Sequence, residues 1–165
     1  MKTKTILIGF LLSLFVLTGY AQNSITAEVK FPDRRGYVND FEGILSSEQV
    51  KELNDLVANH EKETSHEIVL VTIGSFEPYP SLFDYSYALA NDWGVGKKDK
   101  NNGIAIVMGK QIRQIRIQVG YGLENKLKDE EAKRIIDHTI VPEFKKGDYY
   151  AGIKMGLAEI INEIK

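Results

Sequence analysis

The sequence predicts a three-layer α/β/α sandwich, an α/β fold built around a small mixed sheet. Two short apolar runs, residues 66–73 and 104–108, have the pattern of buried strands and alternate with amphipathic helical patterns. A third strand pattern, 112–119, follows the second run after a short turn, which predicts an antiparallel hairpin. Because helices that alternate with strands pack outside the sheet, we expect helices on both of its faces.

The helices have local start and stop signals. Ser46 followed by Gln49 is typical of a capping box, and Asp148 is suited to cap the last helix. Pro142 lies inside the third helical pattern, and we expect it to kink or split that helix. A short extended segment, 37–40, precedes the first helix. The helical patterns cover residues 46–64, 82–92, 129–146 and 149–164.

Residues 1–21 have the pattern of a cleavable signal peptide. Lys2 and Lys4 precede an almost unbroken apolar run, Ile6–Leu17, and the sequence Gly19-Tyr20-Ala21 has the small-x-small form of a signal peptidase site. The apolar run is shorter than the roughly 20 residues that a spanning helix needs. We therefore predict cleavage after Ala21 and a periplasmic or secreted location; an uncleaved membrane anchor is the alternative.

The predicted mature chain consists of a polar lead, 22–36, and one folded domain, 37–165, with no membrane span. The whole chain carries 21 basic and 23 acidic residues, and loss of two lysines with the leader makes its net charge about −4. This acidic balance argues against nucleic acid as a partner, because phosphate binding needs a basic face. The absence of cysteine excludes thiol nucleophiles and thiolate metal sites. We expect a monomer.

The hairpin brings two glycine-rich segments to one end of the sheet. The segment before its first strand is 92–103 and the segment after its second strand is 120–124. Glycine lets the backbone approach a ligand closely, and side-chain oxygens suit a hard cation such as Ca²⁺. The alternative is ordinary turn chemistry, in which glycine, Asp and Asn only shape the loops. The candidate oxygen ligands are Asp92, Asp99, Asn101, Asn102 and Glu124.

Five short motifs follow one another along the chain. They are Val38-x-Asp40 with Leu45-Ser46, Asp92-Trp93-Gly94-x-Gly96, Asn102-Gly103, Gly120-Tyr121-Gly122-Leu123-Glu124 and Pro142-x-Phe144-x-x-Gly147-Asp148-Tyr149. In this order they resemble the TPM domain family, which includes thylakoid-lumen acid phosphatase-like proteins and many exported bacterial members. The resemblance covers about residues 37–165 and implies an α/β/α fold with a divalent-cation site, usually calcium.

The resemblance also implies which residues bind the metal. Asp40, Asp92 and Glu124 match the acidic positions of the family motifs, and Asp99 and Asn102 lie in the matching loop as further candidates. The hairpin argument does not place Asp40 in the cleft, so this residue enters through the resemblance alone. Calcium is the expected cation and magnesium the alternative.

Two functions are compatible with these features. The first is a binding module of the cell envelope, in which Ca²⁺ or Mg²⁺ stiffens the 93–103 loop and the domain recognises a protein partner. The second is a metal-dependent acid phosphatase that acts on phosphomonoesters. The loops contain no Asp-x-Asp pair and no arginine to hold a phosphate, which favours the binding module. Many bacterial relatives continue into a transmembrane helix, whereas this chain stops at Lys165, so we expect no such attachment.

Overall fold

A computed structural model describes residues 30–165, and the predicted signal peptide lies outside these residues. Its centre is a four-stranded sheet in the order β1-β2-β3-β4, with β1, β2 and β3 parallel and β4 antiparallel to β3. The strands are β1 (Val38–Asp40), β2 (Glu67–Thr72), β3 (Gly103–Gly109) and β4 (Gln114–Val119). The helical segments are α1 (Ser47–Thr64), α2 (Leu82–Asp92), α3 (Asp129–Ile135), the π-helix η1 (Ile136–Ile140), α4 (Val141–Lys145) and α5 (Tyr149–Glu163).

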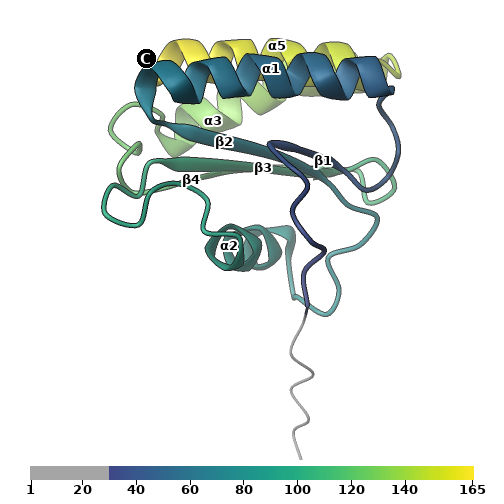
Figure 1. The fold of residues 1–165 in the computed structure, drawn as a ribbon. Coiled ribbons are helices and arrows are strands. Elements are labelled where there is room, and N and C mark those ends of the chain that lie inside the picture. Colours follow the sequence, from purple (N-terminus) through teal and green to yellow (C-terminus); the bar gives the residue numbers. More distant parts are fainter. Residues whose placement is uncertain (1–29) are drawn as a thin grey trace, which may run out of the picture.

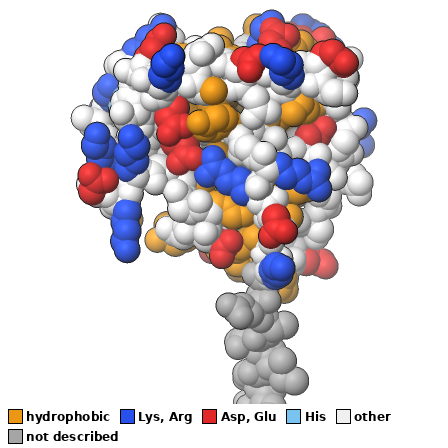
Figure 2. All heavy atoms as spheres, viewed as in Figure 1, with side chains coloured by type: hydrophobic (Ala, Val, Ile, Leu, Met, Phe, Trp, Pro, Cys, Tyr) orange, Lys and Arg blue, Asp and Glu red, His pale blue; other side chains and the backbone are white. Residues whose placement is uncertain are grey.

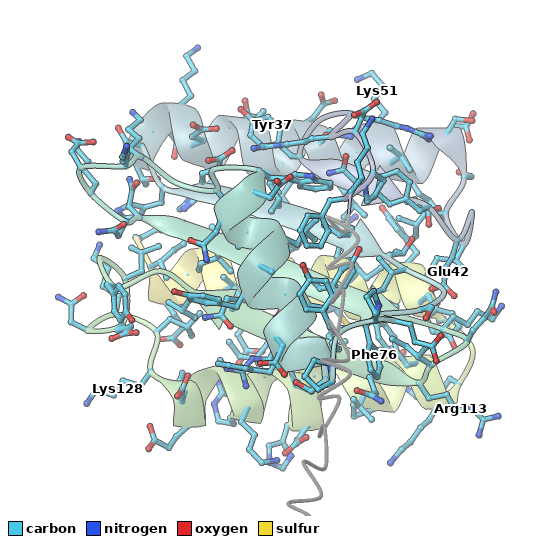
Figure 3. All side chains as sticks on the ribbon, turned by 90° about the horizontal axis from the view of Figure 1, so that it is seen from below. Tyr37, Glu42, Lys51, Phe76, Arg113 and Lys128 are labelled. Carbon is cyan, nitrogen blue, oxygen red and sulfur yellow. The ribbon has the colours of Figure 1, made fainter. Side chains whose placement is uncertain are left out.

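Helices cover both faces of the sheet, which confirms the three-layer fold. Helices α1, α3 and α5 lie on one face, and α2 lies alone on the other (Figure 1). Seen from the α2 side, this helix runs across the sheet (Figure 3). Alternate residues of β2 enter different cores: Leu70 packs towards α1 and α5, whereas Val71 packs towards α2. Burial on both faces explains why this strand is almost continuously apolar.

The local signals in the sequence have the expected structural outcome. The Ser46 side chain accepts a hydrogen bond from the Gln49 N–H, and the Gln49 side chain accepts one from the Ser46 N–H, which forms a capping box at α1. The Asp148 carboxylate caps α5 by accepting from the Ala151 N–H at 2.9 Å. These interactions satisfy N–H groups that have no partner inside the helix.

The third helical pattern is interrupted as expected, in the form of a five-residue π-helix. The segment η1 lies between α3 and α4, and Pro142 is the second residue of α4. Proline has no N–H, and its ring clashes with the carbonyl four residues earlier in a regular α-helix. The wider π turn lets the chain continue through this position.

The lead segment is fastened to the α2 side of the domain. Phe31 is buried, and its ring stacks on Tyr79 at 5.7 Å and meets Tyr85 edge-on at 5.3 Å. The Trp93 indole N–H donates to the Pro32 carbonyl at 3.1 Å.

No helix within residues 30–165 is both long enough and apolar enough to cross a membrane. Acidic and basic side chains are interspersed over the face seen in Figure 2.

His60 is the most deeply buried titratable side chain at the junction of α1 and β2. It is 4% exposed, and its ring centroid lies 5.9 Å from that of His66. Burial, followed by repulsion from His66, lowers the pKa of His60, because the charged imidazolium is poorly solvated there. The pKa of His66 is lowered too, first by burial and then by Lys126.

These lowered pKa values predict that the domain loses stability in mild acid. The unfolded chain binds protons at a histidine pKa of about 6.5, whereas the folded chain resists protonation. The free energy of unfolding is therefore highest above that pH and falls as the pH drops below it. Each unit of pKa depression is worth about 1.4 kcal/mol. Urea unfolding between pH 7.5 and 5 should show a shallower decline for His60→Gln than for the unsubstituted protein. An equal decline in both proteins would contradict this assignment.

Candidate functional site

The two glycine-containing loops meet at the amino end of the sheet, the end at which β2 and β3 begin. The Gly120 N–H donates to the Gly103 carbonyl at 2.8 Å, and the Gly122 N–H donates to the Asn101 carbonyl at 3.0 Å. This pairing extends the β3–β4 hairpin, in which Ile104 lies opposite Val119. The sequence prediction that both loops lie side by side is confirmed.

The glycines permit the two backbones to touch. A Cβ atom at Gly120 would lie 2.3 Å from the Asn101 carbonyl oxygen, and one at Gly122 would lie 2.0 Å from the Lys100 carbonyl oxygen. A Cβ at Gly103 would lie 2.4 Å from the Val95 carbonyl oxygen. Real side chains do not tolerate such contacts, so only glycine fits. The sequence predicts that these glycines admit a ligand, whereas in the structure they let one loop pack against the other.

Glu67, at the start of β2, links the 93–103 loop to the lead segment. Its side chain is 14% exposed and forms an ion pair with Arg34 of the lead. Its second carboxylate oxygen accepts a hydrogen bond from the Gly96 N–H at 2.6 Å. Sequence reasoning missed this residue, and the only signal was a single acidic side chain at the head of an apolar strand.

Asn102 braces the loop from inside. It is 5% exposed, its amide nitrogen donates to the Ser65 carbonyl at 2.6 Å, and its amide oxygen accepts from the Lys97 N–H at 2.9 Å. The side-chain oxygen that was predicted to bind a metal is therefore engaged within the protein. Asp92 and Asp99 are exposed at the same end of the sheet.

Asp40 lies at the opposite, carboxyl end of the sheet. It is the last residue of β1, in register with Thr72 at the end of β2. Its carboxylate accepts hydrogen bonds from the Thr72 hydroxyl at 2.6 Å and from the Leu45 N–H at 2.8 Å, which fixes the turn before α1. The structure does not bring Asp40 together with Asp92 and Glu124, because the length of the sheet separates them.

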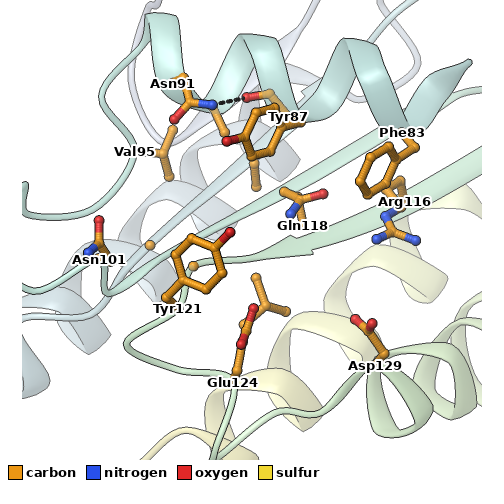
Figure 4. Close-up of a pocket in the computed structure, with 15 residues that line it drawn as sticks. Phe83, Tyr87, Asn91, Val95, Asn101, Arg116, Gln118, Tyr121, Glu124 and Asp129 are labelled. Atoms are coloured by element: carbon orange, nitrogen blue, oxygen red, sulfur yellow. Dashed lines mark hydrogen bonds between the residues drawn. The ribbon is translucent and has the colours of Figure 1, made fainter. Parts of the chain in front are cut away.

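A cavity of about 290 Å³ opens at the amino end between α2, β4 and the two loops (Figure 4). Phe83 and Tyr87 face it from α2, while Glu124 rises towards it from the loop after β4. Its lining is Phe83, Tyr87, Ala90, Asn91, Val95, Asn101, Gly103, Ala105, Arg116, Gln118, Val119, Gly120, Tyr121, Glu124 and Asp129. This cavity is the candidate functional site.

Polar groups without partners concentrate in this cavity. The Nε atom of Arg116 and the Oε1 atom of Gln118 are buried, yet neither has a hydrogen-bond partner within residues 30–165. The Arg116 guanidinium lies over the Phe83 ring, 4.8 Å from its centroid. Buried polar groups normally have partners, so this pair is suited to a polar ligand. Alternating apolar and polar residues in 112–119 predict one polar face for this strand, but the pattern does not reveal the cavity that the face lines.

The predicted cation site is only partly assembled. No group of three or more His, Cys, Asp or Glu side chains in the part of the chain that the structure covers is arranged to hold a metal ion. Glu124 and Asp129 nevertheless line one cavity, and Asp92 adjoins Asn91 in its wall. Ca²⁺ takes six to eight oxygen ligands and accepts water among them. These exposed carboxylates fit a loose, largely hydrated site, whereas the five-residue set predicted from the sequence does not converge.

A family model described as TPM domain matches residues 38–163. The solved N-terminal domain of a protein from Porphyromonas gingivalis is 33% identical, with a TM-score of 0.71, over 77% of this chain and 80% of that one. The N-terminal domain of the cg2496 protein from Corynebacterium glutamicum is 14% identical, with a TM-score of 0.62, over 83% of this chain and 86% of that one. No protein of curated function matches the chain.

A third solved structure, the BA42 protein of the psychrophilic bacterium Bizionia argentinensis, is 20% identical. Its TM-score is 0.64, and the match covers 75% of this chain and 83% of that one. At these lower identities the likeness to the second and third structures shows the fold alone. The fold of the sandwich is therefore shared by proteins of widely different sequence.

The loop packing predicts that Gly120→Ala destabilises the domain. The new Cβ would overlap the Asn101 carbonyl, and relief of such overpacking costs on the order of 1–3 kcal/mol. Urea unfolding at neutral pH measures the difference. The matched control is Gly74→Ala, whose Cβ would meet nothing nearer than 3.8 Å and whose effect should stay within about 0.5 kcal/mol. Equal stability of the two variants would show that the loops are not held together by this contact.

Proposed function

The chain belongs to the TPM domain family, and we propose that it works as an exported binding module of the cell envelope, whose cavity at the amino end of the sheet binds a divalent cation. Calcium is the first candidate and magnesium the second. The export part of the proposal depends on the signal-peptide pattern of residues 1–21.

The observation that carries the proposal is the set of unpaired carboxylates around one cavity. Glu124 and Asp129 line it, and neither forms an ion pair within residues 30–165. The two carboxylates outnumber the single cation of the lining, Arg116, so the cavity keeps a net negative charge that attracts a cation. Asp92 and Asp99 are exposed on the neighbouring loop, together with Lys97, Lys98 and Lys100.

A site of this kind binds weakly and selects its cation by charge. Oxygen sites of extracellular modules commonly bind Ca²⁺ with a Kd of about 10⁻⁴–10⁻³ M. Glu124 and Asp129 would supply the charged ligands, and water would complete the coordination. Asp40 is outside this set, because its carboxylate is bound to Thr72 and Leu45 at the other end of the sheet.

The surroundings of the cavity suit a protein partner. Tyr121 is 75% exposed, Tyr87 is 50% exposed and Phe83 is 49% exposed, and all three line the cavity. Exposed aromatic side chains beside unpaired polar groups are typical of interaction surfaces. An envelope protein that covers these rings and reaches Arg116 is the partner we propose.

The proposal predicts that calcium binds at the cavity at the amino end of the sheet, with a Kd in the millimolar range or lower. Amide chemical shifts of residues 91–103 and 120–129 should move, and the fluorescence of Trp93, the single tryptophan, should change with them. Glu124→Gln should weaken binding about tenfold, because it removes a charge-assisted contact.

Asp40→Asn is the matched control for this titration. The asparagine oxygen can accept from the Leu45 N–H while its NH₂ group donates to the Thr72 hydroxyl oxygen, so the turn should persist and the calcium affinity should stay unchanged. Loss of binding in Asp40→Asn but not in Glu124→Gln would place the cation at the carboxyl end. No movement of any of these amides in about 10 mM calcium would refute the proposal.

One observation favours phosphatase activity as a second candidate. The sequence analysis found no arginine in the loops, but β4 brings Arg116 to the same cavity as Glu124 and Asp129. Arginine binds phosphate oxygens through paired N–H donors, and carboxylates hold the cation that such hydrolysis uses. Within residues 30–165, however, no nucleophile paired with a base is evident at this cavity, so the binding module remains the principal proposal.

The phosphatase candidate predicts cation-dependent hydrolysis of p-nitrophenyl phosphate by the purified protein. Arg116→Gln should then lower kcat/KM by about tenfold or more, because it removes a charge-assisted contact to the phosphate. Activity that survives Arg116→Gln and Asp92→Asn unchanged would come from another protein in the preparation.

A further inference from the structure

A second cavity lies at the carboxyl end of the sheet, away from the candidate site. It has a volume of about 520 Å³ and sits between the β3–β4 turn and α4. Figure 3 shows Arg113 of this turn at the same end of the molecule as Glu42 and opposite to Lys128. Its lining is Gly109, Lys110, Arg113, Gln114, Ile115, Val141, Phe144, Lys145 and Tyr149.

Three cations surround this cavity without a carboxylate among its lining residues. Lys110, Arg113 and Lys145 form no ion pair with any side chain of residues 30–165. The ammonium group of Lys110 lies 5.3 Å from the centroid of the Tyr149 ring. Like charges that line one cavity repel one another, and an anion placed among them would relieve that repulsion.

Acidic side chains around the cavity are already engaged, and Asp137, which interacts with Lys145, pairs with Lys133. The Glu42 carboxylate accepts hydrogen bonds from the backbone N–H groups of Lys110 at 2.7 Å and Gln111 at 3.1 Å. Glu143 pairs with Lys146 at 2.6 Å. Glu42 thus holds the turn through its backbone and leaves the Lys110 side chain free to face the cavity.

The floor of the cavity is apolar. Ile115, Val141, Phe144 and Tyr149 form it, and the rings of Phe144 and Tyr149 lie 4.8 Å apart. Phe144 and Tyr149 belong to the last of the five sequence motifs, residues 142–149. No residue of this motif lines the cavity at the amino end. A positive rim over an apolar floor suits a ligand that has both an anionic and an apolar part.

Arg113 adds an independent argument. Its φ angle is +51°, in the left-handed region that glycine and asparagine adopt far more readily than arginine. An arginine at such a turn position sacrifices stability, and strain of this kind is concentrated at functional positions. The strain has an explanation if the guanidinium contributes to ligand binding.

We propose that this cavity binds a small amphipathic anion, with a phosphate or carboxylate head group held by Lys110, Arg113 and Lys145 and an apolar chain laid against Phe144 and Tyr149. Arginine offers a planar pair of donors to such oxygen anions, and lysine offers a flexible point charge. The cavity volume lies within the range of ligand pockets, about 300–1,000 Å³. The ligand source is a lipid head group or a free metabolite of the same chemistry.

The test is a titration of the purified protein with decyl phosphate below its micelle concentration, followed by amide chemical shifts. Shifts should be confined to residues 109–115 and 141–149. Two controls each lack one part of this ligand: decanol has no anion, and inorganic phosphate has no apolar chain. Each should bind at least about tenfold more weakly than decyl phosphate, because it loses a charge-assisted contact or a few buried methylenes. Equal binding of decanol, or shifts spread elsewhere, would overturn the proposal.

Arg113→Asn separates binding from folding. Asparagine tolerates the left-handed turn, so the Tm should stay unchanged or rise, while decyl phosphate binding should weaken about tenfold. Lys128→Gln is the charge-matched control at the other end of the molecule and should bind as the unsubstituted protein does. Unweakened binding in Arg113→Asn would refute the role of the guanidinium.

Two further measurements make the outcome specific. Glu124→Gln should leave decyl phosphate binding unchanged, so failure of the calcium proposal would not affect this one. One result would be that the protein cosediments with phosphatidylglycerol vesicles but not with phosphatidylcholine vesicles, and that Arg113→Asn weakens this cosedimentation. That result would identify a lipid head group as the source. Binding of decyl phosphate without vesicle binding would identify a free small molecule.

Discussion

The direct backbone contact between the 93–103 and 120–124 loops organises the amino end of the molecule. Two backbone hydrogen bonds join the loops, and glycines at 103, 120 and 122 let the chains approach within distances that any side chain would prevent. Glu67 anchors the first loop at the Gly96 N–H and ties it to the lead through Arg34. The cavity exists because these loops form a wall that α2 and β4 alone would leave open.

The sheet divides the chemistry of the domain between its two ends. Strand β3 has seven residues and therefore spans roughly 20 Å. Glu124 and Asp129 line the cavity at the amino end, whereas Lys110, Arg113 and Lys145 line the cavity at the carboxyl end. The charges of opposite sign are too far apart to pair directly. The cavity at the carboxyl end is thus lined by cations without a carboxylate, whereas the cavity at the amino end has Arg116 beside its two carboxylates; these local differences exist although the net charge of the chain is only −2.

The fold could be predicted from the sequence because its signals are local. Hydrophobic periodicity, the Ser46 capping box and the short turn between 108 and 112 each act over a few residues, and hairpin geometry then placed the two glycine loops together. The site could be predicted only in part, because a motif gives the order of residues along the chain and not the distances between them in the fold. Asp40 matches the family pattern, but it ends β1 at the carboxyl end of the sheet, away from the cavity. The contacts of Glu67 and the position of Arg116 depend on packing across the sheet.

The locked loops also limit how a cation could act. Stiffening of the 93–103 loop by Ca²⁺ is one prediction from the sequence, yet the backbone there is already paired and braced by Asn102. A cation bound at Glu124 and Asp129 would gain little from further ordering of the backbone. Its main effect would be electrostatic, since it would neutralise two carboxylates beside Tyr87 and Tyr121. The cation would then govern which charge a partner must present to this surface, and the fold would remain the same with or without it.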